Sequence, residues 1–209
     1  MISIIIAYNR DRGFLKEAIQ SAEAQTFKDF EIIVHQGNVN FSTNLNNAIK
    51  KAKGEYIKII NEDDLLTPNC LKDLYKGILG FDFINANAFV FGINPMWYGD
   101  EEYHESEHKG KLTNFPEMLD RNQMSQVTIM YRTDAILEVG GFDESLDTAE
   151  DYDINLLLLS KGYKLNYIDK IVGKYRLHET NKSVSLPAYA FHERKAKIKQ
   201  LMQDRYGKI

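Results

Sequence analysis

The sequence has few of the features that mark secreted, membrane-spanning or nucleic-acid-binding proteins. Cys70 is the only cysteine among 209 residues, which excludes a disulfide framework and a thiolate metal cluster and indicates a reducing compartment. No apolar run approaches the ~20 residues that span a bilayer, and the apolar start, residues 2–6, is too short for a secretion signal. A net charge of −4 gives no basic face for nucleic acid. We therefore expect a soluble, cytoplasmic protein that binds no nucleic acid.

Two kinds of apolar pattern alternate in the first part of the chain. Runs of β-branched residues, typical of buried strands, are separated by segments whose apolar residues recur every three or four positions, as on one helix face. This alternation predicts an α/β fold with a mostly parallel central sheet flanked by helices on both faces. The predicted strands are residues 2–8, 30–35, 56–60 and 83–91, and the predicted helices lie near residues 15–22, near residues 45–52 with Ser42 as cap, and from Pro68.

The second half is less regular. Residues 94–114 predict a loop or an excursive hairpin, in which His104 and His108 have the spacing of a metal-binding helix face. No buried helix is indicated there, so we favour a solvated face. Residues 187–206 predict a helix that docks by one apolar edge, with contact to anionic lipid as the alternative. The other predicted elements are strands at residues 127–132, 164–168 and 171–177 and helices at residues 133–139 and 149–161.

An acidic cluster directly follows the third predicted strand. Asp63 and Asp64 bring like charges together at the carboxyl end of that strand, which is costly unless a cation or hydrogen-bond donors neutralise them. Ligands of open α/β sheets bind at this edge, and a hard divalent cation shared with a diphosphate is the natural occupant. The alternative is that the two acids turn the chain and cap the next helix.

Two further groups are candidates for chemistry. Glu150 and Asp151 begin the predicted buried helix, where the helix dipole and unpaired amides favour an ionised carboxylate. A carboxylate ionised at neutral pH suits a base that accepts a proton from an alcohol, and ordinary charge complementarity at a helix start is the alternative. His178 follows the last predicted strand and is either a ligand of a divalent metal or a structural histidine.

Several motifs in this order resemble those of family 2 glycosyltransferases of the GT-A fold. The similarity runs from about Ile2 to Ser183. The matching segments are residues 2–10 for the family's first strand and nucleotide-contacting turn, 14–34 for its first helix and second strand, 52–64 for the approach to its acidic metal motif, 140–144 for its acceptor loop, 150–153 for its catalytic-base motif and 175–178 for its C-terminal histidine.

The resemblance implies an inverting, metal-dependent enzyme that moves a sugar from a nucleoside-diphosphate donor to a saccharide or lipid-linked acceptor, in surface polysaccharide or glycolipid synthesis. Asp151 would be the general base, supported by Glu150. Asp63 and His178 would ligate Mn²⁺ or Mg²⁺, which neutralises the departing diphosphate. The implied nucleotide and donor contacts are Ala7, Tyr8, Asn9, Gln36, Asn44, Asn47 and Asp64, with Tyr8 stacking on the base.

Two departures from the family pattern bear on this site. Where the family usually has an acidic pair after the second strand, one member of which often binds uracil, this chain has His35 and Gln36. The amide oxygen of Gln36 can accept the same hydrogen bond, so a UDP-sugar is the expected donor and the base stays open. Asn61 replaces the first acid of the metal motif and leaves Asp63 as the main ligand. The alternative function is a catalytically silent module that binds nucleotide-sugars.

We expect one domain over residues 1–209. Residues 1–92 would form the nucleotide-binding half and residues 93–183 the acceptor-binding and catalytic half. Residues 184–209 would form the C-terminal helix, which is also the segment expected to touch a membrane if the protein is peripheral to one.

Overall fold

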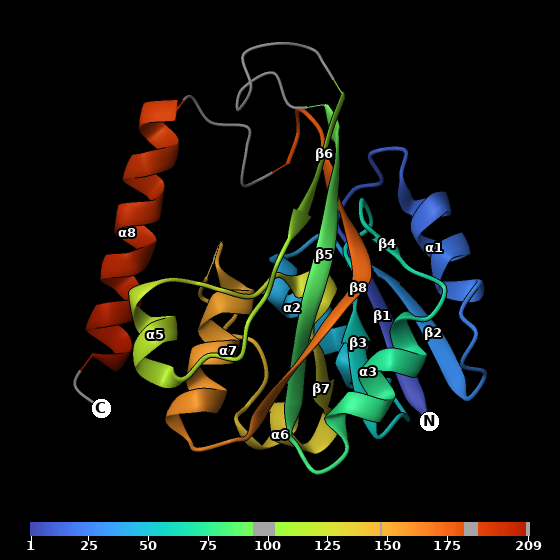
Figure 1. Cartoon of the computed structure of the whole chain (residues 1–209). Coiled ribbons are helices and arrows are strands. Elements are labelled where there is room, and N and C mark those ends of the chain that lie inside the picture. Colours follow the sequence, from blue (N-terminus) through green and yellow to red (C-terminus); the bar gives the residue numbers. More distant parts are fainter. Residues whose placement is uncertain (94–102, 147, 182–187, 208–209) are drawn as a thin grey trace.

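A sheet of eight strands runs through the protein and carries helices on both faces (Figure 1). The structure is a computed structural model, and it describes residues 1–93, 103–146, 148–181 and 188–207. In these residues the strands are β1 (Ile2–Tyr8), β2 (Phe30–Gln36), β3 (Tyr56–Ile59), β4 (Leu65–Leu66), β5 (Phe83–Ile93), β6 (Tyr103–His108), β7 (Met130–Arg132) and β8 (Leu165–Leu177). The helices are α1 (Leu15–Glu23), α2 (Phe41–Ile49), α3 (Cys70–Ile78), α5 (Phe115–Asp120), α6 (Thr133–Glu138), α7 (Glu150–Ser160) and α8 (Ala188–Tyr206), with a short 3-10 helix at Gln126–Thr128.

The strands lie in the order β2-β1-β3-β7-β5-β8-β4, and β6 pairs with the second half of β5. Parallel pairing joins β1 to β2 and β3, and joins β5 to β8. The short strand β7 is antiparallel to both β3 and β5, which makes β3 and β5 run the same way. The sheet is therefore mixed, and β1, β2, β3, β5 and β8 end at one shared edge. The direction of β7 interrupts the expected parallel order, because strand–helix alternation does not fix the direction of a three-residue strand that follows α5 and the 3-10 helix.

Both faces of the sheet are covered, as expected. Side chains alternate between the faces of a strand, so Ile4 of β1 joins the apolar cluster of α1 and α3, with Ala18 and Leu71. Ile5 joins the cluster of α2, α6 and α7, with Leu45. All five side chains are fully buried.

Two helix starts differ from the sequence prediction. The cap of α2 is Asn40 and not Ser42, because the Asn40 side chain accepts the backbone N–H groups of Ser42, at 2.8 Å, and Thr43, at 3.4 Å. α3 begins at Cys70, after a turn that contains Pro68.

Two strand predictions also change. The segments at residues 164–168 and 171–177 form the single strand β8, whose register against β5 shifts near Asn87. Such an irregularity bends a strand without ending it, which explains the break in the apolar pattern. Residues 127–132 divide into the end of the 3-10 helix and the strand β7.

The hairpin prediction is confirmed in its described part, because β6 pairs antiparallel with β5, from Ala88 opposite His108 to Ile93 opposite Tyr103. Residues 94–102 lie outside the described residues. His104 and His108 are on a strand, so they do not share a helix face and the helical metal motif is not formed.

Gly92 lets β5 and β8 stay paired up to their carboxyl ends. Its φ is +119°, and a Cβ there would lie 2.3 Å from the carbonyl oxygen of Leu177. Only glycine fits this close approach. The end of β8, and with it His178, is thereby held at the edge where β1 and β3 also end.

α8 packs beside α5 and α7, on the side of the sheet away from α1 (Figure 1). Met202 and Tyr206 are buried in the cluster that also holds α7. This is the docked apolar edge that we favour from the sequence. Among the described residues, none of the helices has the length and apolarity needed to cross a membrane.

Candidate active site

The carboxyl edge of the sheet gathers residues that are far apart in the sequence. Tyr8 and Gln36, the last residues of β1 and β2, are directly paired. Ile59, the last residue of β3, pairs with Ile5, and the acids begin at Glu62, after two more residues. His178 follows β8 at the same edge. This placement agrees with the expectation that strand-end polar residues meet at one site.

The acids after β3 are buried. Glu62 is 5% exposed, Asp63 8% and Asp64 1%. The ring nitrogen Nε2 of His178 lies 3.0 Å from Oδ2 of Asp63, so the two predicted metal ligands are neighbours. Arg12, in the loop between β1 and α1, forms an ion pair with Glu62, and its Nη1 lies 3.8 Å from Oδ2 of Asp63. The fold therefore supplies hydrogen-bond donors to the acids, which was one of the two ways to offset their charge.

Arg176 connects the acidic cluster to the neighbouring strands and helix. Its backbone N–H donates to Oδ1 of Asp64 at 3.0 Å, and its Nε donates to the carbonyl oxygen of Asp63 at 2.8 Å. The guanidinium also bonds Glu17 of α1 at 2.7 Å. It lies 4.5 Å from the ring centroid of Phe14 and 4.8 Å from that of Phe91, within cation–π range. Arg176 thus ties β8 to β3, α1 and β5 around the acids.

His178 is oriented by its neighbours. Its backbone N–H donates to the side chain of Asn181 at 2.6 Å, and Thr180 contacts the other ring nitrogen, Nδ1, at 3.0 Å. The ring centroid lies 4.9 Å from that of Phe14. Contacts of this kind fix the ring of a metal-binding histidine.

Burial dominates the electrostatics of the cluster. It raises the pKa of Asp64 well above its ordinary value, and the charge of Asp63 adds to the effect. The pKa of Glu62 is raised for the same two reasons, while Arg12 opposes the shift. Close to the acids lies Lys58, a fully buried amine whose pKa burial lowers to about 8, while Asp64 acts in the opposite direction.

The donor set suits a hard divalent cation. An aspartate oxygen and a neutral imidazole nitrogen, at 3.0 Å from each other, can bind one ion, and Mg²⁺ or Mn²⁺ commonly completes its shell with water and substrate phosphates. Asp64 is committed to the N–H of Arg176 and lies too deep to be a first ligand. Over the described parts of the chain, no group of three His, Cys, Asp or Glu side chains has the geometry of a complete metal site. The residues present therefore fit an ion that completes its shell with ligands other than these side chains.

The predicted nucleotide contacts divide into two kinds. The Tyr8 hydroxyl lies 3.4 Å from Oε1 of Gln36, and both side chains reach the surface. Ala7 and Asn44 are fully buried. Asn44 donates to Asn9 and, at 3.1 Å, to the carbonyl oxygen of Gly37, so it braces the turns after β1 and β2. This differs from the expectation that Asn44 approaches the nucleotide directly.

Asn47, one turn further along α2, is half-buried. It therefore keeps some access to solvent that Asn44 lacks. Its predicted contact with the nucleotide or sugar stays a prediction.

The candidate base lies at the start of α7. α7 ends just before β8 begins, at the amino edge of the sheet. Its eleven residues are ~16 Å long, so Glu150 and Asp151, at its start, lie toward the carboxyl edge (Figure 1). Ala149, which precedes them, has φ +63°, a left-handed conformation that is strained outside glycine. Strain of this kind often accompanies functional positions.

Asp151 does not keep an ordinary carboxylate pKa. Burial, and then the charge of Glu150, raise its pKa to about 7, while the backbone N–H of Tyr152, at 2.8 Å from Oδ1, lowers it. The sequence predicts a carboxylate ionised at neutral pH, and burial opposes this effect of the helix start. A pKa near 7 is the value that suits a general base at neutral pH.

The loop at residues 140–146 connects α2 with the base helix. Asn46 of α2 exchanges two hydrogen bonds with the backbone of Phe142, at 2.8 and 2.9 Å, and also donates to Glu144 at 2.9 Å. Asn40 donates to the carbonyl oxygen of Leu146 at 2.9 Å. The segment that resembles an acceptor loop is thus held by Asn40 and Asn46, at the cap and within α2.

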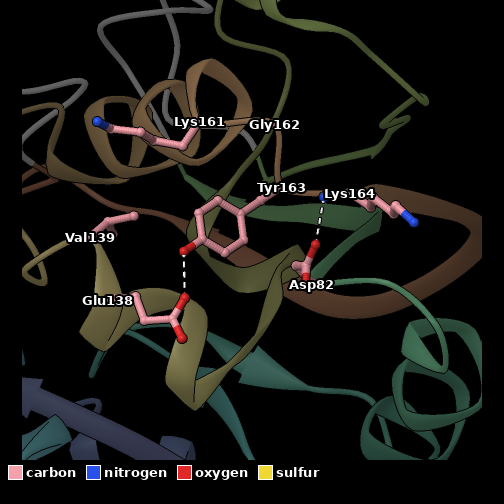
Figure 2. A pocket seen from close by; sticks show the side chains of 7 residues that line it. All are labelled: Asp82, Glu138, Val139, Lys161, Gly162, Tyr163 and Lys164. Atoms are coloured by element: carbon pink, nitrogen blue, oxygen red, sulfur yellow. Dashed lines mark hydrogen bonds between the residues drawn. The ribbon is translucent and has the colours of Figure 1, made fainter.

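A surface hollow of about 520 Å³ lies elsewhere (Figure 2). Tyr163 donates to Glu138 at 2.7 Å, and the backbone of Lys164 donates to Asp82 at 2.7 Å. These residues stand where β5 and β8 begin and α6 ends. The hollow is therefore at the amino edge, opposite the acidic cluster, and does not belong to the candidate site.

Several residues of the site escape sequence reasoning. Arg12 and Arg176 contact acids 50 or more positions away, and Glu62 is not among the residues that the sequence singled out. Phe14 and Asn181 support His178. The acids themselves indicate that hydrogen-bond donors or cations lie nearby, because a buried carboxylate must be paired. The sequence does not say which Arg or Lys side chain is the partner.

The fold, with its site at the carboxyl edge of the sheet, matches a class of known structures. The structure resembles S. aureus TarS in complex with UDP-GlcNAc, with a TM-score of 0.68, 18% identity and coverage of 92% of this chain and 63% of that one. It also resembles the mannosyltransferase PcManGT from Pyrobaculum calidifontis in complex with GDP-Man and Mn²⁺, with a TM-score of 0.63, 12% identity and coverage of 93% and 60%. The protein therefore has the GT-A glycosyltransferase fold.

The sequence comparisons give the family. The model of "Glycosyl transferase family 2" matches residues 32–140, and the chain belongs to this family. It is 25% identical to the uncharacterized glycosyltransferase MJ1057 of Methanocaldococcus jannaschii, over 85% of this chain and 71% of that protein. It is 24% identical to the O-antigen biosynthesis glycosyltransferase WbnJ of Escherichia coli, over 92% and 85%. The chain spans 64% of a third relative, RT0329 of Rickettsia typhi, at 27% identity.

Proposed function

We propose that this protein is an inverting, metal-dependent glycosyltransferase that moves a sugar from a nucleoside-diphosphate donor, a UDP-sugar in the first instance, to an acceptor hydroxyl in surface polysaccharide or glycolipid synthesis. The observation that carries the proposal is the pairing of Asp63 with His178 at 3.0 Å, at the carboxyl edge of the sheet. It is supported by the family match and by relatives and neighbours whose names include O-antigen biosynthesis, UDP-GlcNAc and GDP-Man.

Asp63 and His178 would hold Mn²⁺ or Mg²⁺, which when bound neutralises charge on the leaving diphosphate. Tyr8 would stack on the base, and Gln36, beside it at the end of β2, would accept a hydrogen bond from the base. Asn9 and Asn47 would line the same pocket, while Ala7 and Asn44 would shape its wall and Asp64 would support it through Arg176.

Asp151 would take the proton of the acceptor hydroxyl as the sugar is transferred, and Glu150 would hold the pKa of Asp151 near neutrality. Attack from the face opposite the diphosphate inverts the anomeric centre. Residues 1–92 would act as the nucleotide half, residues 93–183 as the acceptor half and residues 184–209 as a C-terminal helix of a single cytoplasmic domain. Contact of that helix with a membrane surface stays a prediction.

Calorimetric titration of UDP, dTDP, GDP and CDP, each with Mn²⁺ and then with EDTA, tests the donor side. We expect one diphosphate to bind tightly and only with metal. A sugar carried by that nucleotide is then assayed for transfer, with Asp151→Asn as the decisive variant. We expect its rate to fall about 10²–10⁴-fold, the usual contribution of a general base, while the dissociation constant of the diphosphate stays within a factor of two or so.

Retention of transfer by Asp151→Asn would refute the base assignment. Binding of a nucleotide-sugar without any transfer by the wild-type protein would favour the alternative function, a silent nucleotide-sugar-binding module. This alternative rests on Asn61, at the first position of the metal motif, and on His35 and Gln36, which replace the family's acidic pair.

A further inference from the structure

The loop between β1 and α1 is shaped so that Arg12 faces the acidic cluster. Oδ1 of Asp11 accepts the backbone N–H of Gly13 at 2.7 Å and that of Leu15 at 3.4 Å, which closes a tight turn. Gly13 has φ +94°, a conformation that glycine adopts at no steric cost. The turn thereby directs Arg12 back over the end of β3, where it meets Glu62.

Arg12 has one side in the cluster and another near solvent. Its side chain is 30% exposed, whereas that of its partner Glu62 is 7% exposed. Both of its contacts with carboxylates, the ion pair with Glu62 and the 3.8 Å approach to Asp63, are made by the single nitrogen Nη1. A guanidinium carries five N–H donors in a planar fork, so the pair with Glu62 orients the group without using all of its capacity.

The other arginine of the cluster is fixed. Arg176 is 13% exposed, lies against the rings of Phe14 and Phe91, and is bonded to the Asp63 carbonyl oxygen and to Glu17. Turning it toward a ligand would break these contacts. Of the two guanidinium groups described here, Arg12 is therefore the one that can present donors to an incoming anion.

The metal motif of this chain has one acid fewer than the family pattern, and the phosphates of a donor would bring further negative charge that a guanidinium can offset. Asn61 stands at its first position, so Asp63 is the carboxylate that lies beside His178. A diphosphate that departs from a sugar gains negative charge, and a fork of N–H donors matches phosphate oxygens in a bidentate way. Arg12 lies within 4 Å of the predicted metal ligand Asp63, and hence beside the place where the phosphates of a metal-bound donor would sit.

We propose that Arg12 is a donor-binding residue that contacts the diphosphate, and that Glu62 is a positioning residue that aims it. The proposal rests on the proposed function, because it takes the diphosphate to be the ligand of the edge site. It deepens that function by assigning charge neutralisation of the diphosphate to a side chain of this chain in addition to the metal.

The test compares a nucleoside diphosphate with its nucleoside. UDP and uridine, or the pair selected by the four-nucleotide titration, are titrated in the presence of Mn²⁺ into the wild-type protein and into Arg12→Gln and Arg12→Lys. Loss of one charged hydrogen-bonded contact weakens binding about 10–100-fold, so we expect that loss for the diphosphate with Arg12→Gln, a smaller loss with Arg12→Lys, and no change for the nucleoside. Lys16→Gln, which removes one positive charge from an exposed position on α1, is the matched control and should bind like the wild type.

A double variant separates ligand binding from simple neutralisation of Glu62. If Arg12 served only to neutralise Glu62, Arg12→Gln with Glu62→Gln would bind the diphosphate like the wild type, and the proposal would fall. We expect the double variant to bind as weakly as Arg12→Gln alone. Unchanged diphosphate binding by Arg12→Gln, or equal losses for nucleoside and diphosphate, would also overturn it.

If the proposed function itself is wrong, the titrations give a different result. In that case the wild-type protein binds none of the four diphosphates, and the role of Arg12 falls with it. Binding by the wild type with an unaffected Arg12→Gln refutes the role of Arg12 alone. Melting temperatures measured without ligand show whether each variant is folded, and Arg12→Lys keeps the charge near Glu62 if Arg12→Gln is not.

Discussion

Asp151 shows how three effects compete at one residue. The start of α7 favours the ionised form, but burial opposes it and the charge of Glu150 opposes it further, so that the pKa rises to about 7. A base must be ionised to accept a proton, so activity should increase as pH rises through 7. Glu150→Gln removes the neighbouring charge, so we expect the pKa of Asp151 to fall and the acid limb of the pH–rate profile to move to lower pH. A carboxyl-carbon NMR titration checks the pKa directly.

The matched control is Asp204→Asn, which removes one negative charge from an exposed position on α8. It should leave the acid limb where it is in the wild type. An acid limb that Glu150→Gln does not move would contradict the assigned cause of the shift.

Lys58 is a second residue whose environment can be measured. Its ammonium is fully buried and donates to the carbonyl oxygens of Ile59, Val127 and Gln126, at 2.8, 2.9 and 3.3 Å. These bonds join β3 to the 3-10 helix below the acidic cluster.

The pH dependence of stability follows from the lowered pKa of Lys58. The folded state holds the proton less tightly than the unfolded chain, with a pKa of about 8 instead of 10.5, so stability is gained as pH rises from 8 to 10.5 and lost as it falls back to 8. At 1.36 kcal/mol per pKa unit the full effect is about 3 kcal/mol. Because other groups titrate in this range, the quantity to measure is the difference in unfolding free energy between the wild type and Lys58→Met. This difference should change by kcal/mol amounts across the window, and a constant difference would be evidence against a lowered pKa.

At the scale of elements, the last turn of α8 makes polar contacts with α7 and with the loop at residues 140–146. The Tyr206 hydroxyl donates to Oδ1 of Asp153 at 2.7 Å, and Nε of Arg205 lies 3.4 Å from the same oxygen. Arg205 also forms an ion pair with Asp143, which holds the pKa of that carboxyl at about 2. One turn of α8 therefore joins the base helix, through Asp153, to the loop at residues 140–146.

Removing the hydroxyl should weaken this attachment. Asp153 is 2% exposed, so in Tyr206→Phe a buried carboxylate loses a donor, and we expect unfolding to become easier by about 1–3 kcal/mol. Chemical denaturation measures this change. Lys197→Gln, which breaks the exposed pair of Lys197 with Glu193 on the same helix, should have almost no effect. Equal stability of Tyr206→Phe and the wild type would show that α8 is held by its apolar edge alone.

At the scale of the whole molecule, the site is a product of strand direction. Residues 8, 36, 63 and 178 are separated by long stretches of chain, yet each follows or ends a strand of the same direction. The sequence predicts β1, β2 and β3 well, because buried parallel strands read as continuous apolar runs. It predicts a strand at residues 127–132, which contains β7, but it does not predict that this strand is short and antiparallel to both neighbours.

The sequence by itself determined the family, the strands β1, β2 and β3 with the helices between them, and the candidates Asp63, Asp151 and His178, since periodicity, strand-end acids and motif order are local properties of the chain. Only the tertiary structure decided the rest. It paired Arg12 with Glu62 and His178 with Asp63, turned Asn44 into a brace, and raised the pKa of Asp151 to about 7. The physical reason is that contact partners and desolvation depend on which distant segments cover a residue, and its sequence neighbours do not contain that information.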